Sequence, residues 1–226
     1  MTAAMPDSDL AEYVRRSVAR TRADRTARIM YRRTQDFGRV GAELAPEGGH
    51  ARRWLGTVVG RVVKKVLSPM RELHAQGVID FEPRRSELDF DGFRVFLDGD
   101  EGYIGMEREG WERARDADQF LALGGPLWLI DLLDDVVTAE VVDPNSGPVS
   151  PPSRPANSEH EAASLRNLIV SVRLKDEGAS RLVLAITVDA DGRIRRISHE
   201  SELIGGTVRI DLCDYGQPRP LDSPVT

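Results

Sequence analysis

The chain has 226 residues, with 31 basic and 37 acidic side chains and a formal net charge of −6. Its 40% hydrophobic and 30% charged content excludes a disordered or fibrous chain. A single cysteine, Cys213, excludes a disulfide framework and a thiolate zinc site, and no apolar run approaches the roughly 18 residues of a membrane-spanning helix. We expect one domain over residues 1–226, because no linker divides the chain into self-sufficient halves.

The charge is unevenly distributed. Residues 1–80 carry 15 basic and 9 acidic side chains, a net +6, whereas residues 81–226 carry 16 and 28, a net −12. Our first interpretation is that the two parts lie against one another and partly neutralise. The alternative is a basic N-terminal surface for nucleic acid or anionic lipid. The arginines near the start are not interleaved with aromatic residues and the whole chain is acidic, so we expect no nucleic-acid binding.

The first predicted element is an amphipathic helix. Asp9 and Glu12 have the spacing of a capping box, which predicts a helix that begins at Asp9. Apolar and small side chains then fall on one face of it: Leu10, Tyr13, Val14, Ser17, Val18 and Thr21. The preceding residues lack the apolar segment of a secretory signal, which predicts a cytoplasmic protein, or one of the cell envelope if the true start lies upstream.

The middle of the chain predicts antiparallel strands joined by tight turns. Asp91-Gly92 suits a type I′ hairpin turn, and residues 98–102 form a second turn cluster. The predicted strands cover residues 27–33, 57–67, 78–81, 87–90, 93–97 and 102–106.

A short helix and a second group of strands follow. Gly124-Gly125-Pro126 predicts the start of an apolar helix over residues 127–133. Residues 143–158 contain five prolines and predict a flexible loop. The predicted strands of this part cover residues 136–142, 168–174, 181–188, 193–198 and 206–213. We therefore expect an α+β protein with one antiparallel sheet of at least seven strands, on which both helices pack.

The search for catalytic and metal motifs is negative. The four histidines (His50, His74, His160 and His199) lie far apart in the sequence, without metal-binding spacing. Asp189-x-Asp191 resembles part of a calcium loop, but Ser198 stands where its bidentate glutamate is required. We interpret these aspartates, and likewise Asp98 and Asp100, as turn residues. We expect no enzyme activity, no metal and no cofactor.

Two other residue types have plain structural interpretations. Cys213, near the end of an alternating strand, is interpreted as a small half-buried hydrophobe, because no histidine can be paired with it from the sequence. The tryptophans are interpreted as anchors of the core or its rim: Trp54, Trp111 and Trp128.

Several segments together resemble one known family. They are residues 76–85, residues 98–105 followed by Trp111, residues 125–133, residues 188–196 and residues 207–218. In this order and spacing, they resemble the LolA-like family, and in particular the actinobacterial LppX/LprG-type lipoproteins. The resemblance implies a strongly curved antiparallel sheet, a half-barrel, with helices over its concave face.

The resemblance also implies a function. Members of the family use the space between sheet and helices for acyl chains or a lipid anchor. We therefore expect a non-enzymatic binding protein for a lipid or other apolar ligand, whose predicted lining residues are Val95, Leu97, Val170, Val172, Leu184 and Ile186. The alternative is a LolA-like module for contact with a protein partner, without lipid cargo. The sequence as given lacks the signal peptide and lipidation cysteine of the lipoproteins, and it leaves the oligomeric state open.

Overall fold

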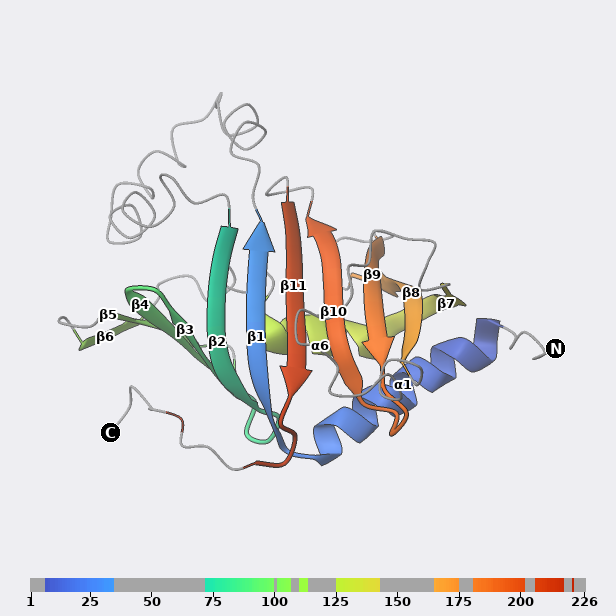
Figure 1. Cartoon of the computed structure of the whole chain (residues 1–226), viewed down its shortest axis with the longest axis horizontal. Coiled ribbons are helices and arrows are strands. Elements are labelled where there is room, and N and C mark those ends of the chain that lie inside the picture. Colours follow the sequence, from blue (N-terminus) through green and yellow to red (C-terminus); the bar gives the residue numbers. More distant parts are fainter. Residues whose placement is uncertain are drawn as a thin grey trace, which may run out of the picture.

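A computed structural model describes residues 7–34, 72–99, 101–106, 110–113, 125–142, 165–174, 181–201, 206–217 and 221. Within these residues the chain builds one sheet of eleven antiparallel strands (Figure 1). The strand order is β6-β5-β4-β3-β2-β1-β11-β10-β9-β8-β7, so the first and last strands pair in the middle. The prediction of one continuous antiparallel sheet is confirmed.

The strands have the following bounds: β1 Thr26–Thr34, β2 Glu72–Asp80, β3 Arg85–Phe90, β4 Phe93–Asp98, β5 Glu101–Met106, β6 Gly110–Arg113, β7 Val136–Val141, β8 Arg166–Arg173, β9 Arg181–Val188, β10 Ile194–Ser201 and β11 Gly206–Cys213. The helices are α1 Asp7–Ala23, α6 Pro126–Leu132 and the short 3-10 helix η1 Leu133–Asp135.

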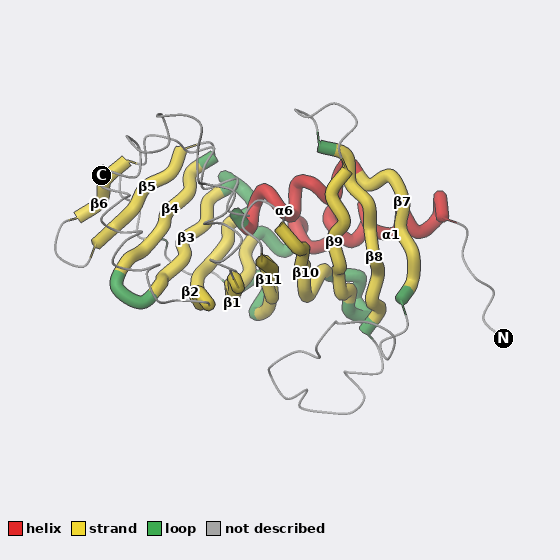
Figure 2. Tube along the Cα trace, turned by 90° about the horizontal axis from the view of Figure 1, so that it is seen from above, coloured by secondary structure: helices red, strands yellow, loops and turns green. Residues whose placement is uncertain are grey.

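The sheet is strongly curved, and the helices lie on its concave side (Figure 2). Helix α1 packs on β7 and reaches β10, whereas α6 crosses the concave side and touches β3. Five residues of the predicted stripe of α1 are buried, as is Ala11, whereas Tyr13 is only partly buried; the five are Leu10, Val14, Ser17, Val18 and Thr21. The expected α+β half-barrel is therefore confirmed. Neither of these helices is long and apolar enough to cross a membrane, and no other helix of the described residues is.

Alternation along the strands separates the two faces of the sheet. On β1, Ala27, Ile29, Tyr31 and Arg33 are buried, while the residues between them are more exposed. The strand pairing carries this face across the sheet as a continuous line of apolar side chains. This line, the central row, consists of Met106, Phe93, Phe90, Ala75, Tyr31, Ile210, Ile197, Ile186 and Leu168.

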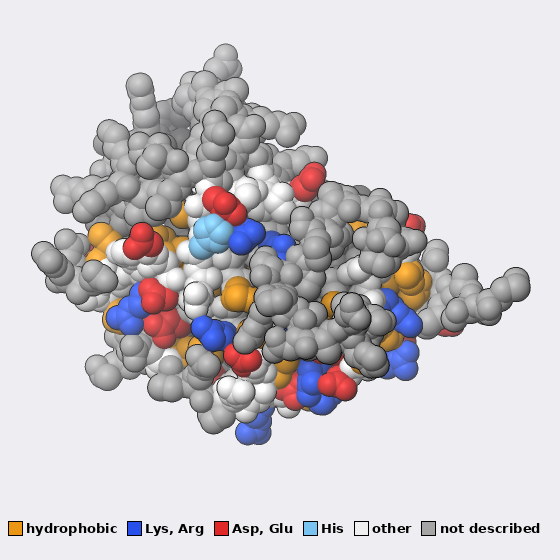
Figure 3. Space-filling view, viewed as in Figure 1, with side chains coloured by type: hydrophobic (Ala, Val, Ile, Leu, Met, Phe, Trp, Pro, Cys, Tyr) orange, Lys and Arg blue, Asp and Glu red, His pale blue; other side chains and the backbone are white. Residues whose placement is uncertain are grey.

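The convex face is polar by comparison. Acidic and basic side chains are intermixed where the described part of this face is visible (Figure 3). Glu72 Oε1 lies 3.4 Å from Arg32 Nε and 3.3 Å from His74 Nε2, and all three side chains are exposed. Apolar side chains also occur on this face, among them Phe96, whose ring lies edge-on to that of Trp111 with centroids 6.0 Å apart. The ion pairs of Glu72 with Arg32 and His74 are exposed to solvent and contribute little to stability.

Ion pairs join the helices to each other and to the sheet. Arg22 on α1 lies 2.7 Å from Asp131 and 2.8 Å from Asp134, and Arg84 contacts Asp131 from the β2–β3 turn. Arg15 donates a hydrogen bond to the carbonyl of Val136 at 3.0 Å. Of the α1 arginines, Arg22 thus pairs with acids of the C-terminal part, whereas Arg15 and Arg20 lie near Glu12 and Asp24 of the N-terminal part.

Three local predictions differ from the structure. Helix α1 begins at Asp7 rather than Asp9. The hairpin turn at Asp91-Gly92 is present, but only Gly92 has a positive φ, at 91°, so the turn is not type I′. Cys213 is buried rather than half-buried, because it lies where β11 pairs with β1.

One face of strand β9 is buried in the core, and the other is partly exposed. On the outer face Val183 is 54% exposed, and the Thr187 hydroxyl bonds Asn167 at 2.8 Å. The predicted strand over 57–67 and the predicted loop over 143–158 lie outside the described residues.

Candidate ligand-binding site

The structure separates the six residues predicted to line a ligand cavity into two groups. Val170 pairs directly with Leu184, and Val172 and Ile186 lie beside them, all four buried on strands β8 and β9. The other two, Val95 and Leu97, lie on β4, with five strands between β4 and β9. All six are buried members of the apolar core. Their role as a ligand lining stays a prediction.

A different feature of the concave face is polar. The row next to the central row consists of Leu73, Arg33, Val208 and His199, on strands β2, β1, β11 and β10. It lies at the upper end of these strands in Figure 1, where β1 and β10 finish. We call Arg33, His199 and their neighbours Tyr31 and Trp128 the Arg33–His199 site.

Arg33 is a buried charge with no acidic partner among the residues that the structure describes. Its side chain shares a face with Ile29 and Tyr31 and is 5% exposed. Its Nε has no hydrogen-bond partner, and among the described side chains its guanidinium bonds the Tyr31 hydroxyl. Burial lowers the pKa of Arg33, and Tyr31 opposes the shift. A guanidinium keeps its proton in any protein, so a positive charge sits here without a counterion among the described residues.

His199 lies two strands away, on β10. Its side chain is 8% exposed, and neither ring nitrogen has a hydrogen-bond partner. Burial lowers the pKa of His199, and the positive charge of Arg33 adds to this effect, whereas the nearby backbone of Glu200 opposes it without reaching hydrogen-bond geometry. The imidazole is therefore neutral at pH 7, with one donor and one acceptor nitrogen both unused.

Aromatic side chains surround these two groups. The ring of Trp128, from α6, lies edge-on to His199 with centroids 6.5 Å apart. Tyr31 contacts Phe90 at 5.9 Å, and Phe90 stacks on Phe93 at 4.6 Å. Trp128, Phe90 and Phe93 are only partly buried against the core. The site thus continues into an apolar surface that the protein's described residues do not fully cover.

Two other polar atoms are buried without a partner in the described part of the chain. Ser86 Oγ faces the concave side near the lower end of β3, and Arg85 Nε belongs to a side chain already paired with Asp98 at 3.0 Å. A neutral hydroxyl costs less to bury than a charge. Arg33 therefore differs from these two groups because it is a buried charge without a described acidic partner. His199 differs because both of its polar atoms lack a partner.

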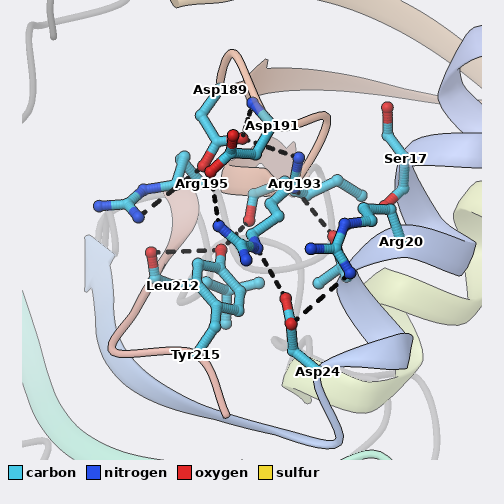
Figure 4. Close-up of polar contacts among 11 residues, drawn as sticks. Ser17, Arg20, Asp24, Asp189, Asp191, Arg193, Arg195, Leu212 and Tyr215 are labelled. Carbon is cyan, nitrogen blue, oxygen red and sulfur yellow. Dashed lines mark hydrogen bonds and ion pairs between the residues drawn. The ribbon is translucent and has the colours of Figure 1, made fainter.

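The lower end of the same strands is arranged differently (Figure 4). There Arg193 Nε lies 2.7 Å from Asp24 Oδ2, and its Nη1 lies 2.7 Å from Asp191 Oδ2. Asp189 Oδ1 accepts the backbone N–H groups of Asp191 and Arg193. The Tyr215 hydroxyl donates to the Ile194 carbonyl. We call these residues the basal network, and the partners they satisfy are all within the protein.

The basal network joins the end of α1 to the β9–β10 turn and the end of β11. It holds several carboxylates, but no group of three His, Cys, Asp or Glu in the described residues has the arrangement of a metal site. The interpretation of Asp189 and Asp191 as turn residues agrees with the bonds that Asp189 makes to the turn backbone. This network serves structure.

The sequence interpretation missed Arg33 and His199. Arg33 follows Ala27, Ile29 and Tyr31 at intervals of two, a phase that places it on the buried face. His199 follows Ile197 in the same way on β10. This two-residue spacing was the sequence signal that could have placed Arg33 and His199 on the buried face.

The fold defines a class of protein, a half-barrel whose concave apolar face is partly covered by helices. One solved structure of this class is the crystal structure of the Mycobacterium tuberculosis lipoprotein LppX, which matches with a TM-score of 0.54. The match covers 96% of this chain and 100% of LppX, at 12% sequence identity. At this identity the likeness is one of fold. No family model and no curated protein matches the sequence.

Proposed function

We propose that this protein binds an apolar ligand, an acyl chain or lipid, between the concave face of the sheet and the helices. The observation that carries the proposal is the central row, an unbroken line of apolar side chains across strands β5 to β8. Its members on β3 and β4, Phe90 and Phe93, are only partly buried. A face of this kind suits a ligand that takes up the apolar area left in contact with water.

The two halves of the concave face have different roles in this proposal. Helix α1 packs over β7 and β10, so Leu184 and Val170 stabilise the fold there. On the other half, the half-buried rings of Phe90 and Phe93, together with the ring of Trp128 on α6, provide the contact surface for the ligand. The fold shared with a lipoprotein supports the proposal. Burial of an acyl chain contributes about 0.8 kcal/mol per methylene before ordering costs.

The test is lipid capture by the purified protein, followed by native mass spectrometry. We expect a population heavier than the bare chain by one ligand mass after incubation with a lipid extract. Phe93→Lys places a charge in the central row next to a turn and should abolish the added mass. Met30→Lys, at a 37% exposed position on the convex face, is the matched control and should keep it.

The folded state of both variants is checked by circular dichroism and thermal melting. If the wild-type protein keeps the mass of its bare chain with every lipid fraction, the proposal is wrong. The protein is then better explained as a LolA-like module for a protein partner, which is the second candidate.

A further inference from the structure

We infer that Arg33, with His199 beside it, binds the oxyanion head group of an amphiphile whose apolar chain lies along the central row. The inference rests on the proposed function and names the class of ligand, an acyl lipid with a single negative charge. The carboxylate of a fatty acid and the phosphodiester of an anionic phospholipid share this chemistry. A neutral lipid or a hydrocarbon does not.

The first argument is the cost of the empty site. An arginine that is 5% exposed has lost most of its hydration, and a buried charge without a partner destabilises the folded state. Charged groups that are strongly desolvated in this way cluster at functional sites. No described carboxylate pairs with Arg33 to offset the cost of burying its charge. The hydroxyl of Tyr31, which it bonds, is neutral and does not balance the charge.

The second argument is the direction in which the nearby acids point. Glu72 on β2 and Glu200 on β10 belong to strands that carry the site, and both are exposed on the convex face. Arg33 shares its own face with Leu73, Val208 and Tyr31. The alternation of the strands therefore turns these two described acids away from Arg33, so that neither of them balances its charge.

The third argument is the match between the site and an acid head group. Arg33 offers a planar set of N–H donors, of which Nε–H is unused, and neutral His199 offers one more N–H. Strands β1 and β10 are separated only by β11, so their backbones lie about 10 Å apart and the two side chains can converge on one oxyanion. The single charge of Arg33 balances a single negative charge.

The fourth argument is position. The Arg33 row and the central row are adjacent on the same face, two residues apart along each strand, or about 7 Å. A head group at Arg33 thus places the first carbons of a chain over Tyr31 and Ile210. From there the central row continues through Phe90 and Phe93 with apolar side chains only.

The experiment compares ligands that differ only in the head group. Affinities of the full chain are measured for oleic acid and oleyl alcohol, and for oleoyl lysophosphatidylglycerol and oleoyl lysophosphatidylcholine. The wild-type protein should bind the anionic member of at least one pair roughly 10- to 100-fold more tightly, because charge-assisted hydrogen bonds contribute this much. Which pair shows the preference identifies the source of the oxyanion.

The variant that tests the site is Arg33→Gln, and Arg32→Gln is its matched control. Arg32 is the neighbouring residue on the same strand, but it is exposed on the opposite face. In Arg33→Gln the preference for the acid should disappear while the affinity for oleyl alcohol is retained. In Arg32→Gln the preference should persist. Thermal melting confirms that both variants are folded.

The remaining outcomes separate the two proposals. Equal binding of acid and alcohol by the wild-type protein, unchanged in Arg33→Gln, overturns the head-group site and leaves the apolar-ligand function standing. A preference for the acid that survives in Arg33→Gln also overturns the site. Absence of binding to all four ligands overturns both.

Discussion

Buried polar groups at the lower end of the central strands are paired within the protein, whereas several of those described at the upper end have atoms without a partner. At the lower end, the basal network gives each buried charge a partner, as with Arg193 and Asp24 at 2.7 Å. At the upper end, Arg33 and His199 are more deeply buried, and Arg33 Nε and both ring nitrogens of His199 have no hydrogen-bond partner. The same strands run between them, so the difference is not one of fold. The charge of Arg193 is paired within the protein, whereas that of Arg33 has no acidic partner among the described residues, and this difference is the basis of the proposed head-group site.

The largest expected effect on stability comes from a substitution in the basal network at the lower end. Asp24→Ala removes the partner of Arg193 Nε, whose bond to Asp24 is the main reason that the pKa of Arg193 is raised. We expect the free energy of unfolding to fall by about 1–2 kcal/mol, because both side chains keep some contact with water and the full value of a charged hydrogen bond is not realised. Chemical denaturation measures the change.

Asp191→Asn is the control for that prediction. Asp191 contacts the same arginine, but its side chain is 68% exposed. Its ion pair is screened by solvent and should contribute less than about 0.5 kcal/mol. If Asp191→Asn destabilised the protein as much as Asp24→Ala, the network would not depend on burial as we describe.

A smaller loss is expected from Tyr215→Phe, also at the lower end. Burial raises the pKa of Tyr215, so its hydroxyl keeps its proton and donates to the Ile194 carbonyl. Removal of the hydroxyl leaves that carbonyl without this donor, at a cost of about 1 kcal/mol. The ring keeps its contacts with Arg193 and Arg195. An unchanged denaturation midpoint would contradict a structural role for the hydroxyl.

At the upper end, removal of a charged side chain should not lower the free energy of unfolding. Arg33→Met replaces an unpaired buried charge by an apolar side chain of similar length, so we expect the unfolding free energy of the ligand-free protein to stay equal or rise by about 1 kcal/mol. Arg32→Met on the exposed side of β1 should change it by less than about 0.5 kcal/mol. A clear loss of stability in Arg33→Met would show that Arg33 is paired within the protein, contrary to the comparison.

The smallest effect is a pH dependence at His199. Because its pKa in the folded protein lies below the ordinary 6.5, the unfolded chain binds a proton that the folded protein excludes. This stability is fully present above pH 6.5 and is lost as the pH falls from 6.5 to the folded pKa. His199→Leu should lose less stability than the wild-type protein between pH 7 and about 5.

His74→Gln is the matched control for that measurement, since His74 is exposed on the convex face and the variant keeps His199. It should lose stability on the acid side as the wild-type protein does. Thermal melting at a series of pH values gives the comparison. Parallel curves for the wild-type protein and His199→Leu would remove His199 from the account.

The sequence predicts most of the fold. Alternation places Val208, Ile210 and Leu212 on one face of β11, and all three are buried in the structure. Alternation does not reveal which strands pair, however. The meeting of β1 with β11 in the middle of the sheet joins the two ends of the chain and puts β4 and β9 on opposite halves. The six predicted lining residues therefore did not form one group.

The polar site was harder to predict for two physical reasons. A charged residue on a strand usually faces solvent, so Arg33 was not assigned to the buried face despite its phase with Ile29 and Tyr31. On β10, an irregularity between Ile194 and Arg196 shifts the phase, and it places Arg196 beside Asp211 while Ile197 and His199 face the core. A sequence pattern does not show such a bulge.

The central claim is that a bound amphiphile holds its acid group at Arg33. The most direct measurement is the pH titration of the carboxyl resonance of ¹³C1-labelled oleic acid in complex with the full chain. We predict that the positive charge of Arg33 keeps the bound carboxyl ionised below about pH 4, where exposed carboxyls gain their protons, and that this shift disappears in Arg33→Gln. A bound carboxyl that titrates as in water, or identically in both proteins, would contradict the account.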